Sequence, residues 1–359
     1  MKRVALIGGG KIGEAIAALL VPTADFELVV VDKDAARVGA LQKLGARTAL
    51  ADVADAAALK AALAKFGKID ILVSACPFFL TPVLAQVALE VGAHYLDLTE
   101  DVESTRVVKK IAAGAKTMFM PQCGLAPGFI SIAAAHVAEQ FTTLDQVNMR
   151  VGALPIYPTN ALKYNLTWST DGLINEYLNP CEAIINGTLR ETPPMEELEH
   201  FSLDGLDYEA FNTSGGLGTL CETLAGKVRN LNYKTVRYPG HCAIMKILLQ
   251  DLGLGQRRDI LKDVLEKSIP MTLQDVVLIF VSVTGQRDAR LAQESWTKKI
   301  YSKKVNGHLL SAIQLTTAAG ICAMVDLMAN GTLNQAGFVR QEQVSLEQFL
   351  ANRFGQHYA

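Results

Sequence analysis

Three glycines near the start of the chain have the spacing of a phosphate-binding loop. Gly8, Gly10 and Gly13 form the order G-x-G-x-x-G, directly after the apolar run Val4–Ile7 and at the start of a helix-forming run. Gly8 allows a tight turn, Gly10 lets the backbone approach a pyrophosphate, and Gly13 lets the helix pack closely on the strand. Amide groups at the start of that helix attract phosphates. The pattern therefore predicts a dinucleotide site.

An acidic residue ends the next apolar run. Asp32 follows Leu28–Val31 and lies about 20 residues beyond the glycines, where a dinucleotide fold places the residue that binds the adenosine ribose. A carboxylate at this position accepts hydrogen bonds from both ribose hydroxyls and repels a 2′-phosphate, which favours NAD over NADP. The neighbouring Lys33 weakens that preference.

Further candidates follow the other predicted strands of the same sheet, because ligands bind outside the carboxyl ends of parallel strands. Asp52 and Val53 follow the third strand and are predicted on the adenine side of the cofactor, although Asp52 serves equally well as the cap of the next helix. The segment after the fourth strand adds Pro77 and Phe78 as predicted substrate neighbours. On position, the predicted cofactor contacts are Gly8, Gly10, Lys11, Ile12, Gly13, Asp32, Lys33, Asp52, Val53, Ala75 and Cys76.

Two glycine-punctuated stretches in the second half carry polar side chains. The hydroxyls of Thr213 and Ser214, with the backbone amides around them, suit an anion such as a carboxylate. Thr235, Arg237 and Tyr238 come just before a Pro-Gly turn, and the guanidinium of Arg237 can pair with a carboxylate through two hydrogen bonds. A purely structural role for Arg237 stays open, because most arginines are solvated.

The elements that must position these residues form two parts. Short apolar strands alternate with helical stretches up to about residue 120, which predicts a doubly wound parallel α/β sheet of the Rossmann type. Alanine-rich segments between the strands, such as Val53–Phe66 and Val83–Val91, have the length to cover its faces. The predicted strands are Val4–Ile7, Leu28–Asp32, Thr48–Ala51, Ile69–Ser74, Tyr95–Leu98 and Thr117–Met120.

Beyond this sheet the pattern changes to an α+β arrangement. The expected strands are Gln146–Gly152, Thr235–Tyr238, Val276–Thr284 and Trp296–Lys303, the last two joined by a turn at Gly285–Asp288. The expected helices are Phe129–Glu139 and Ser311–Ala329, and Asn330-Gly331 ends the second in the usual way.

Composition excludes several classes of function. The 359 residues are enough for two domains, and 34 Lys and Arg against 36 Asp and Glu give a formal net charge of −2. This balance suggests neither nucleic acid nor a membrane surface, so a small-molecule partner is expected. Six scattered cysteines without metal-like spacing indicate a reducing compartment, here the cytoplasm, and no metal site. No apolar run long enough for a membrane span is evident.

Four motifs in order along the chain carry a resemblance to a known family. The motifs CGLAPG (123–128), WSTDGLINEY (168–177), TSGG (213–216) and RYPGH (237–241) resemble the saccharopine dehydrogenase-like family over nearly the whole length. The resemblance implies a two-domain enzyme that forms a homodimer or a higher homo-oligomer. It implies a dinucleotide domain at 1–125, an α+β substrate and dimerisation domain at 126–315, and a segment at 316–359 that returns to the first. It also implies that Gly124, Leu125 and Pro127 approach the nicotinamide.

The chain departs from the saccharopine-reducing branch at two places. That branch typically has Asp where this chain has Ala126, and an Asn-Arg-Asp stretch where this chain has Thr213-Ser214-Gly215. Loss of that arginine suits a smaller substrate with fewer carboxylates. The resemblance therefore implies NAD-dependent oxidative deamination of the ε-amino group of L-lysine, with Thr213, Ser214, Arg237 and His241 lining the substrate pocket.

Oxidation of an amine requires its neutral form, and a free amine titrates near about 10.4, so a base or an alkaline medium is needed. Asp97, Glu222 and His241 are the candidate bases, and the sequence leaves open which of them acts. A structural role is the alternative for His241, and a surface position in the first turn of a helix is the alternative for Glu222. Two other functions stay open: a saccharopine- or carboxynorspermidine-type reductase, and a non-catalytic NAD-binding redox sensor.

Overall fold

The structure is a computed structural model that describes residues 1–333 and 335–359, and it divides into two compact units. Unit 1 consists of Met1–Phe129, Lys304–His308 and Gln314–Ala359. Unit 2 consists of Ile130–Lys303 and Leu309–Ile313. Unit 1 is thus assembled from both ends of the chain, with unit 2 inserted between them.

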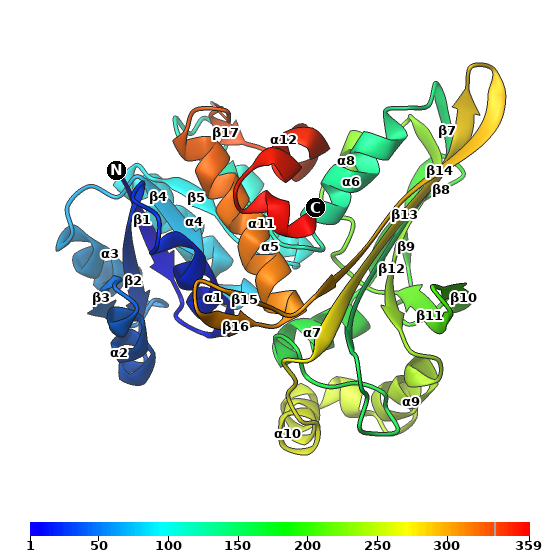
Figure 1. Ribbon diagram of the computed structural model, residues 1–359, viewed down its shortest axis with the longest axis horizontal. Helices are drawn as coiled ribbons and strands as arrows, with labels where there is room; N and C mark the ends of the chain where they lie inside the picture. Colours follow the sequence, from blue (N-terminus) through cyan, green and yellow to red (C-terminus); the bar gives the residue numbers. More distant parts are fainter. Residues whose placement is uncertain (334) are drawn as a thin grey trace. The chain divides into compact units, whose positions relative to one another are not determined.

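Unit 1 contains a parallel sheet of seven strands in the order β17-β6-β5-β4-β1-β2-β3 (Figure 1). The order reverses at β1, where a dinucleotide crevice is expected. This arrangement confirms the predicted α/β class, but the sequence indicated six strands and missed β17, a two-residue strand beside β6. The strands are β1 (Lys2–Ile7), β2 (Phe26–Asp32), β3 (Arg47–Leu50), β4 (Ile71–Ser74), β5 (His94–Leu96), β6 (Met118–Met120) and β17 (Gly337–Phe338).

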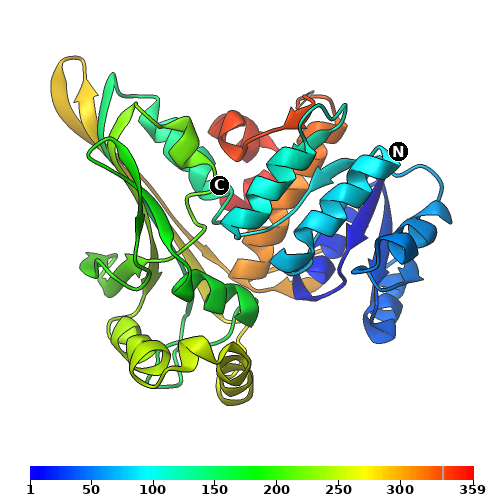
Figure 2. The same cartoon turned by 180° about the vertical axis from the view of Figure 1, so that it is seen from behind.

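Helices cover both faces of this sheet. Helices α3, α4 and α5 pack side by side on one face (Figure 2), around a core that includes Leu59, Leu84 and Val108. The helices of unit 1 are α1 (Lys11–Leu20), α2 (Ala35–Lys43), α3 (Ala56–Ala64), α4 (Thr81–Val91), α5 (Val102–Ile111), most of α11 (Ala312–Ala329) and α12 (Leu346–Ala351), with the short turns η1 (Phe78–Leu80), η4 (Gln341–Gln343) and η5 (Gly355–Tyr358).

Aspartates fix where these helices begin. The carboxylates of Asp34, Asp55 and Asp101 accept hydrogen bonds from amides in the first turns of α2, α3 and α5. Such caps satisfy helix amides that have no partner within the helix. The alternative reading of Asp52 as the cap of α3 is therefore wrong. The Asp52 carboxylate accepts from the Ala54 amide, at 3.0 Å, before the helix begins.

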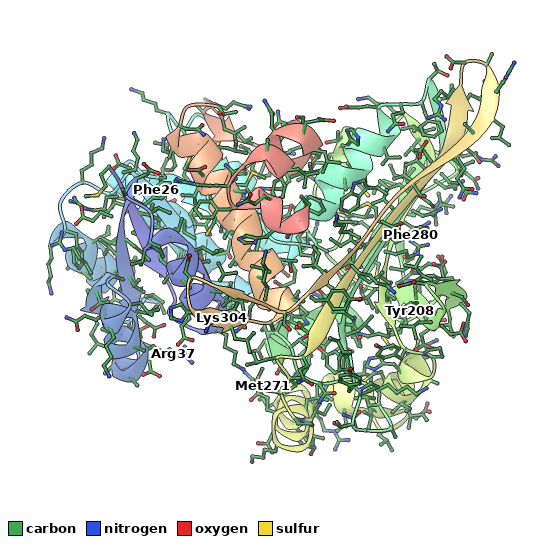
Figure 3. The ribbon with its side chains drawn as sticks, viewed as in Figure 1. Phe26, Arg37, Tyr208, Met271, Phe280 and Lys304 are labelled. Atoms are coloured by element: carbon green, nitrogen blue, oxygen red, sulfur yellow. The ribbon has the colours of Figure 1, made fainter. Side chains whose placement is uncertain are left out.

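Unit 2 is built on a mixed sheet in the order β10-β11-β12-β7-β13-β14, with β8 pairing to β12 and β9 to β8. Only β12 and β7 run parallel. Phe280 and Tyr208, labelled in Figure 3, both pack on Phe201, with ring centroids 6.2 and 5.7 Å away. The strands are β7 (Thr143–Pro155), β8 (Cys181–Ile185), β9 (Thr188–Thr192), β10 (Glu199–Leu203), β11 (Leu206–Asn212), β12 (Val228–Arg237), β13 (Asp275–Arg287) and β14 (Arg290–Tyr301). A separate hairpin consists of β15 (Lys303–Val305) and β16 (His308–Leu310).

The turn of the β13–β14 hairpin lies further along than predicted. β13 continues to Arg287, and the turn is Asp288-Ala289, whose φ angles are 53° and 59°. Gly285 is not part of the turn. It lies within β13 at an irregularity of the ladder, where a Cβ would come 2.0 Å from the Thr143 carbonyl oxygen. Glycine is needed there for close approach of two strands.

The remaining helices lie around this sheet. They are α6 (Phe129–Ala138), α7 (Thr170–Leu178), α8 (Leu220–Thr223), α9 (His241–Lys246), η2 (Ile247–Asp251), η3 (Leu254–Gln256) and α10 (Arg258–Ser268). Among the described residues, α11 alone is long and apolar enough to cross a membrane by length and composition, and 72% of it is buried inside the protein. A buried core helix passes the same test, so this is weak evidence for a span.

Candidate cofactor and substrate sites

The glycine loop of unit 1 leaves room for a pyrophosphate. Gly8 has φ +99°, and a Cβ on Gly13 would lie 2.1 Å from the Gly8 carbonyl oxygen, so both positions require glycine. At Gly10 the nearest atom to an added Cβ is Arg37 Nη1, 3.8 Å away, and a side chain here would fill otherwise open space. Among the described residues, no side chain caps α1. The loop and the start of α1 therefore fit the phosphates of a dinucleotide.

Asp32 binds this loop directly. Its Oδ2 accepts a hydrogen bond from the Gly9 amide at 2.6 Å, and its Oδ1 accepts from the Asp34 amide at 2.8 Å. The side chain is buried, while Lys33 is exposed. Arg37 projects from α2 (Figure 3) and places Nη1 3.8 Å from Asp32 Oδ2. This exposed guanidinium, which the sequence interpretation overlooked, adds positive charge on the side where a 2′-phosphate would lie.

The other predicted cofactor residues of this sheet edge differ in their surroundings. The Ala75 amide donates to the Ile7 carbonyl at 2.8 Å, which joins the carboxyl ends of β4 and β1. The thiol of Cys76 donates to the same carbonyl at 3.3 Å, and burial raises its pKa to about 12. Asp52 is exposed. The side chain of Val53 packs in the hydrophobic core.

The loop at 123–128 is held inside unit 1 by residues from the end of the chain. Gly124, Leu125 and Pro127 are all buried. Gly320 of α11 packs so closely on the loop that a Cβ would lie 2.8 Å from the Cys123 carbonyl oxygen. The side chain of Gln341 donates to the Pro121 carbonyl at 3.2 Å.

Asp97, which directly follows β5, holds the start of this loop in place. Its Oδ1 accepts from the amides of Gln122 and Thr99 at 2.9 and 3.0 Å, and its carbonyl accepts from the Cys123 amide at 2.8 Å. Burial raises the pKa of Asp97 to about 6, against the two amide bonds, which lower it. Gln122 has φ +65°, a conformation that these bonds stabilise. Asp97 therefore positions the loop, whatever further role it has.

Arg237 is a buried cation at the end of β12. Its side chain is 3% exposed, and its Nε and Nη1 donate to the Tyr177 hydroxyl at 2.9 Å and to the Val236 carbonyl at 2.8 Å. The guanidinium carbon lies 5.3 Å from the centre of the Tyr164 ring. Within the described chain, no carboxylate lies within 4.0 Å of this guanidinium. Burial acts to lower the pKa of Arg237, but Tyr177, Tyr164 and Glu176 outweigh it and raise the pKa, so the group is charged.

His241 lies in the same cluster, at the first residue of α9, and is 1% exposed. Its Nδ1 contacts the Leu162 carbonyl at 2.9 Å and its Nε2 contacts the Tyr177 hydroxyl at 3.1 Å. Burial, and then the positive charge of Arg237, lower the pKa of His241 to about 3. Both ring nitrogens are occupied and the ring is neutral. This geometry disfavours the role of general base predicted for His241 and favours the structural alternative.

The four predicted substrate hydroxyls fall into two groups. Ser214, Thr235 and Tyr238 donate to backbone carbonyls at 2.9, 3.4 and 2.9 Å, so their hydroxyl groups stabilise the fold. The buried Thr213 hydroxyl makes no hydrogen bond to the described residues, and the same is true of the Tyr164 hydroxyl. Thr213 therefore keeps its hydroxyl donor for a ligand, whereas the other three donate theirs to the backbone.

Three predicted residues remain, Glu222 in unit 2 and Pro77 and Phe78 in unit 1. Glu222 is exposed on the four-residue helix α8 of unit 2. Pro77 and Phe78 belong to unit 1, where Pro77 precedes η1 and Phe78 is half-buried. The Phe78 carbonyl accepts from the Ser104 hydroxyl at 3.2 Å. The three candidate bases are thus divided, with Asp97 in unit 1, His241 buried in unit 2, and Glu222 at the surface.

Sequence interpretation missed the residues that hold Arg237 and His241. Tyr177 belongs to α7, whose residues from 170 to 177 are nearly all buried, and Glu176 of the same helix is a buried carboxylate. Glu209 of β11 accepts from the amides of Gly240 and Cys242 at 2.7 and 2.6 Å, which fixes the start of α9. The sequence of α7, TDGLINEYL, mixes apolar and polar residues, so it gave no clear signal that this helix is buried.

Family models match both parts of the chain. Residues 124–355 match the saccharopine dehydrogenase C-terminal domain, and residues 4–120 match the saccharopine dehydrogenase NADP binding domain. The chain belongs to the saccharopine dehydrogenase family. Its members are NAD(P)-dependent oxidoreductases, which supports the prediction that this chain is an enzyme. The match also agrees with the family resemblance of the four motifs.

Solved structures share this fold at low sequence identity. Saccharopine dehydrogenase (L-Glu forming) from Saccharomyces cerevisiae aligns over 100% of this chain and 96% of its own, with a TM-score of 0.79 and 18% identity. Homospermidine synthase from Legionella pneumophila, solved in complex with NAD, covers 99% of this chain and 89% of its own, with a TM-score of 0.72 and 14% identity. At these identities the likeness shows the fold alone.

A curated relative is much longer than this chain. The mitochondrial alpha-aminoadipic semialdehyde synthase of Bos taurus is 20% identical over 250 residues, which are 64% of this chain and 26% of that protein. The chain spans about a quarter of the length of this relative. The comparisons support binding of NAD or NADP and do not distinguish the two.

Proposed function

We propose that this chain is an L-lysine 6-dehydrogenase, which oxidises the ε-amino group of L-lysine with NAD to the 6-semialdehyde, and that this product cyclises to piperideine-6-carboxylate. The buried guanidinium of Arg237, with no carboxylate within 4.0 Å in the described chain, carries the proposal. A buried charge with no ion pair within 4.0 Å among the described residues is costly, even though Glu176 raises its pKa, so the site favours an anionic group of the ligand. The single α-carboxylate of lysine meets that requirement.

The other buried cations near the same sheet are already neutralised. Arg150 forms an ion pair with Glu199, and Lys234 Nζ lies 3.0 Å from the same carboxylate and 3.8 Å from that of Glu197. Arg237 is therefore the cation of this cluster that remains for a substrate. One such cation supports a substrate with one carboxylate and argues against saccharopine, which carries three.

The reaction balances as lysine, NAD⁺ and water giving the aldehyde, ammonium, NADH and a proton. When bound, NAD supplies the acceptor for the hydride that leaves Cε. We assign Arg237 and the Thr213 hydroxyl to the substrate carboxylate, and the glycine loop to the pyrophosphate. The amine must be neutral at this step, so the pH profile of kcat/KM reports whether Asp97, Glu222 or the alkaline medium removes its proton.

A panel of substrates tests the proposal. The purified chain is mixed with NAD or NADP and with L-lysine, saccharopine or 1,4-diaminobutane, and reduced cofactor and ammonium are measured. We expect lysine-dependent formation of one ammonium per NADH, with NAD preferred. Turnover of saccharopine without turnover of lysine would identify a reductase of the saccharopine type. NAD binding by calorimetry without turnover of any amine would identify a redox sensor.

A further inference from the structure

Four segments of unit 2 meet in a single chain of hydrogen bonds. Arg237 ends β12, Tyr177 lies in α7, His241 begins α9, and Leu162 lies in the loop before α7. The consecutive distances are 2.9 Å from Arg237 Nε to the Tyr177 hydroxyl, 3.1 Å from that hydroxyl to His241 Nε2, and 2.9 Å from His241 Nδ1 to the Leu162 carbonyl. All three side chains are at most 3% exposed.

The chemistry of the two ends gives this chain one direction. A carbonyl oxygen only accepts, so the proton of the neutral His241 ring lies on Nδ1 and is donated to Leu162. Nε2 then carries a lone pair and accepts from the Tyr177 hydroxyl. The Arg237 Nε–H only donates, so it is bound by the lone pairs of the Tyr177 oxygen. With the ring neutral, each group has its required role, and the other tautomer cannot donate to the Leu162 carbonyl.

The surrounding backbone holds both ends of the chain in place. The Glu209 carboxylate binds the amides of Gly240 and Cys242 on either side of His241. Lys163 Nζ donates to the Pro239 carbonyl at 3.0 Å, which ties the segment carrying Leu162 to the turn before His241. The imidazole is therefore fixed, and it fixes the direction of the Tyr177 O–H bond.

We propose that Tyr177 is a positioning residue, and that with His241 it aims the Arg237 guanidinium so that a single substrate carboxylate binds at Nη2. Two of the three guanidinium nitrogens are used within the protein, because Nε donates to Tyr177 and Nη1 to Val236. Nη2 makes no hydrogen bond to the described residues. A guanidinium held this way presents one end, rather than its Nε side, to a ligand. The inference rests on the proposed function for the identity of the ligand.

Nuclear magnetic resonance of the histidine side chains tests the hydrogen-bond chain without any substrate. Long-range ¹H–¹⁵N spectra, assigned with His241→Gln, should show His241 protonated on Nδ1, with Nε2 accepting a hydrogen bond. In Tyr177→Phe the Nε2 signal should shift to that of a nitrogen without a hydrogen bond. Tyr164→Phe is the matched control, because it also removes a buried hydroxyl beside Arg237 but leaves the chain intact. A proton on Nε2 in the wild type, or no shift in Tyr177→Phe, overturns the inference.

Kinetics test the consequence for the substrate. Tyr177→Phe should raise KM for L-lysine about 10- to 100-fold, the value of one hydrogen bond to a charged group, with little change in kcat. The rate on 1,5-diaminopentane, which lacks the carboxylate, should not change. Tyr208→Phe removes a buried hydroxyl elsewhere on the sheet and should leave both substrates unaffected. An equal loss on lysine and 1,5-diaminopentane would show a merely structural role and overturn the inference.

Two further results keep the outcomes separate. If Tyr177→Phe does not fold, two variants of His241 replace it. His241→Leu removes the acceptor of the Tyr177 hydroxyl, whereas His241→Gln keeps an acceptor in part. The inference requires a larger rise in KM for L-lysine in His241→Leu than in His241→Gln. If the wild type oxidises no lysine, the proposed function fails, while the nuclear magnetic resonance result still decides whether His241 accepts a hydrogen bond from Tyr177.

Discussion

In unit 1 the groups that we propose to face a ligand are backbone amides and glycines within a few residues of one another, whereas in unit 2 the proposed groups are side chains brought together from distant segments. Gly8, Gly10 and Gly13 form the first site within one turn and the start of one helix. Arg237 and Tyr177 of the second site are 60 positions apart, and His241 and Leu162 are 79 positions apart. A backbone site is determined by local conformation, and a side-chain site by tertiary packing.

The largest expected effect tests the side-chain site. Arg237→Leu should lower kcat/KM for L-lysine about 10²- to 10³-fold, because it removes the charge-assisted bonds to the carboxylate. The activity on 1,5-diaminopentane in the same variant is the internal control and should hold. A similar loss on both substrates would mean that Arg237 supports the fold of unit 2 rather than the substrate.

The contributions of Asp97 and His241 to the free energy of unfolding should change in opposite directions with pH. Burial raises the pKa of Asp97 from 3.8 to about 6, so the folded state binds the extra proton in this range and the free energy of unfolding falls as pH rises. Burial lowers the pKa of His241 from 6.5 to about 3, so the unfolded state binds the extra proton and the free energy of unfolding rises with pH. Each slope approaches about 1.4 kcal/mol per pH unit.

Urea unfolding from about pH 4 to 6 measures these slopes by difference. Relative to the wild type, Asp97→Asn should make the free energy of unfolding rise more steeply with pH, and His241→Gln should make it rise less steeply. Variants that change the slope in the same direction would contradict the assignment of a neutral, buried His241.

Two glycine variants separate folding from ligand binding in the backbone site. Gly13→Ala places a Cβ 2.1 Å from the Gly8 carbonyl oxygen, so it should cost about 1–3 kcal/mol of stability and weaken cofactor binding. Gly10→Ala meets no atom nearer than 3.8 Å, so its melting temperature should stay close to that of the wild type while NAD affinity by calorimetry falls. Unchanged NAD affinity in Gly10→Ala would place the pyrophosphate elsewhere.

The smallest expected effect concerns the choice of cofactor. Asp32→Ala should shift the ratio of kcat/KM for NAD and NADP about tenfold toward NADP, because the carboxylate that repels a 2′-phosphate is lost. Arg37→Ala is the matched opposite and should shift the ratio toward NAD. Equal ratios in both variants and the wild type would show that Asp32 and Arg37 do not determine the choice between NAD and NADP.

Sequence alone revealed the parallel sheet and its glycine loop, because both rest on short-range patterns. Three dipeptides that favour two-residue turns were overlooked beyond the parallel sheet. Asn186-Gly187 joins β8 to β9, Asp204-Gly205 joins β10 to β11, and Asn306-Gly307 joins β15 to β16, all with positive φ. The first two would have divided the region from 181 to 212 into hairpins.

The structural surroundings of the second site could not be read in the same way. The sequence singled out Arg237 and His241, but nothing local to them indicates that Tyr177 lies between their side chains. Nor does the sequence show that Glu209 holds the start of α9, or that both nitrogens of His241 are occupied. These facts depend on how α7, β11 and β12 pack. The residues next to His241 in the sequence therefore could not test its predicted role as a base.

The discontinuity of unit 1 also has a consequence for the order of folding during synthesis. The strand β17 adds to β6, Gly320 packs on the Cys123 carbonyl, and Tyr358 donates to the Thr316 carbonyl. Unit 1 therefore cannot be completed until the last part of the chain has been synthesised. Unit 2 is encoded almost entirely between these parts and emerges from the ribosome earlier than β17. Unit 2 can therefore complete its sheet while the cofactor unit is still open, although the cofactor loop is made first.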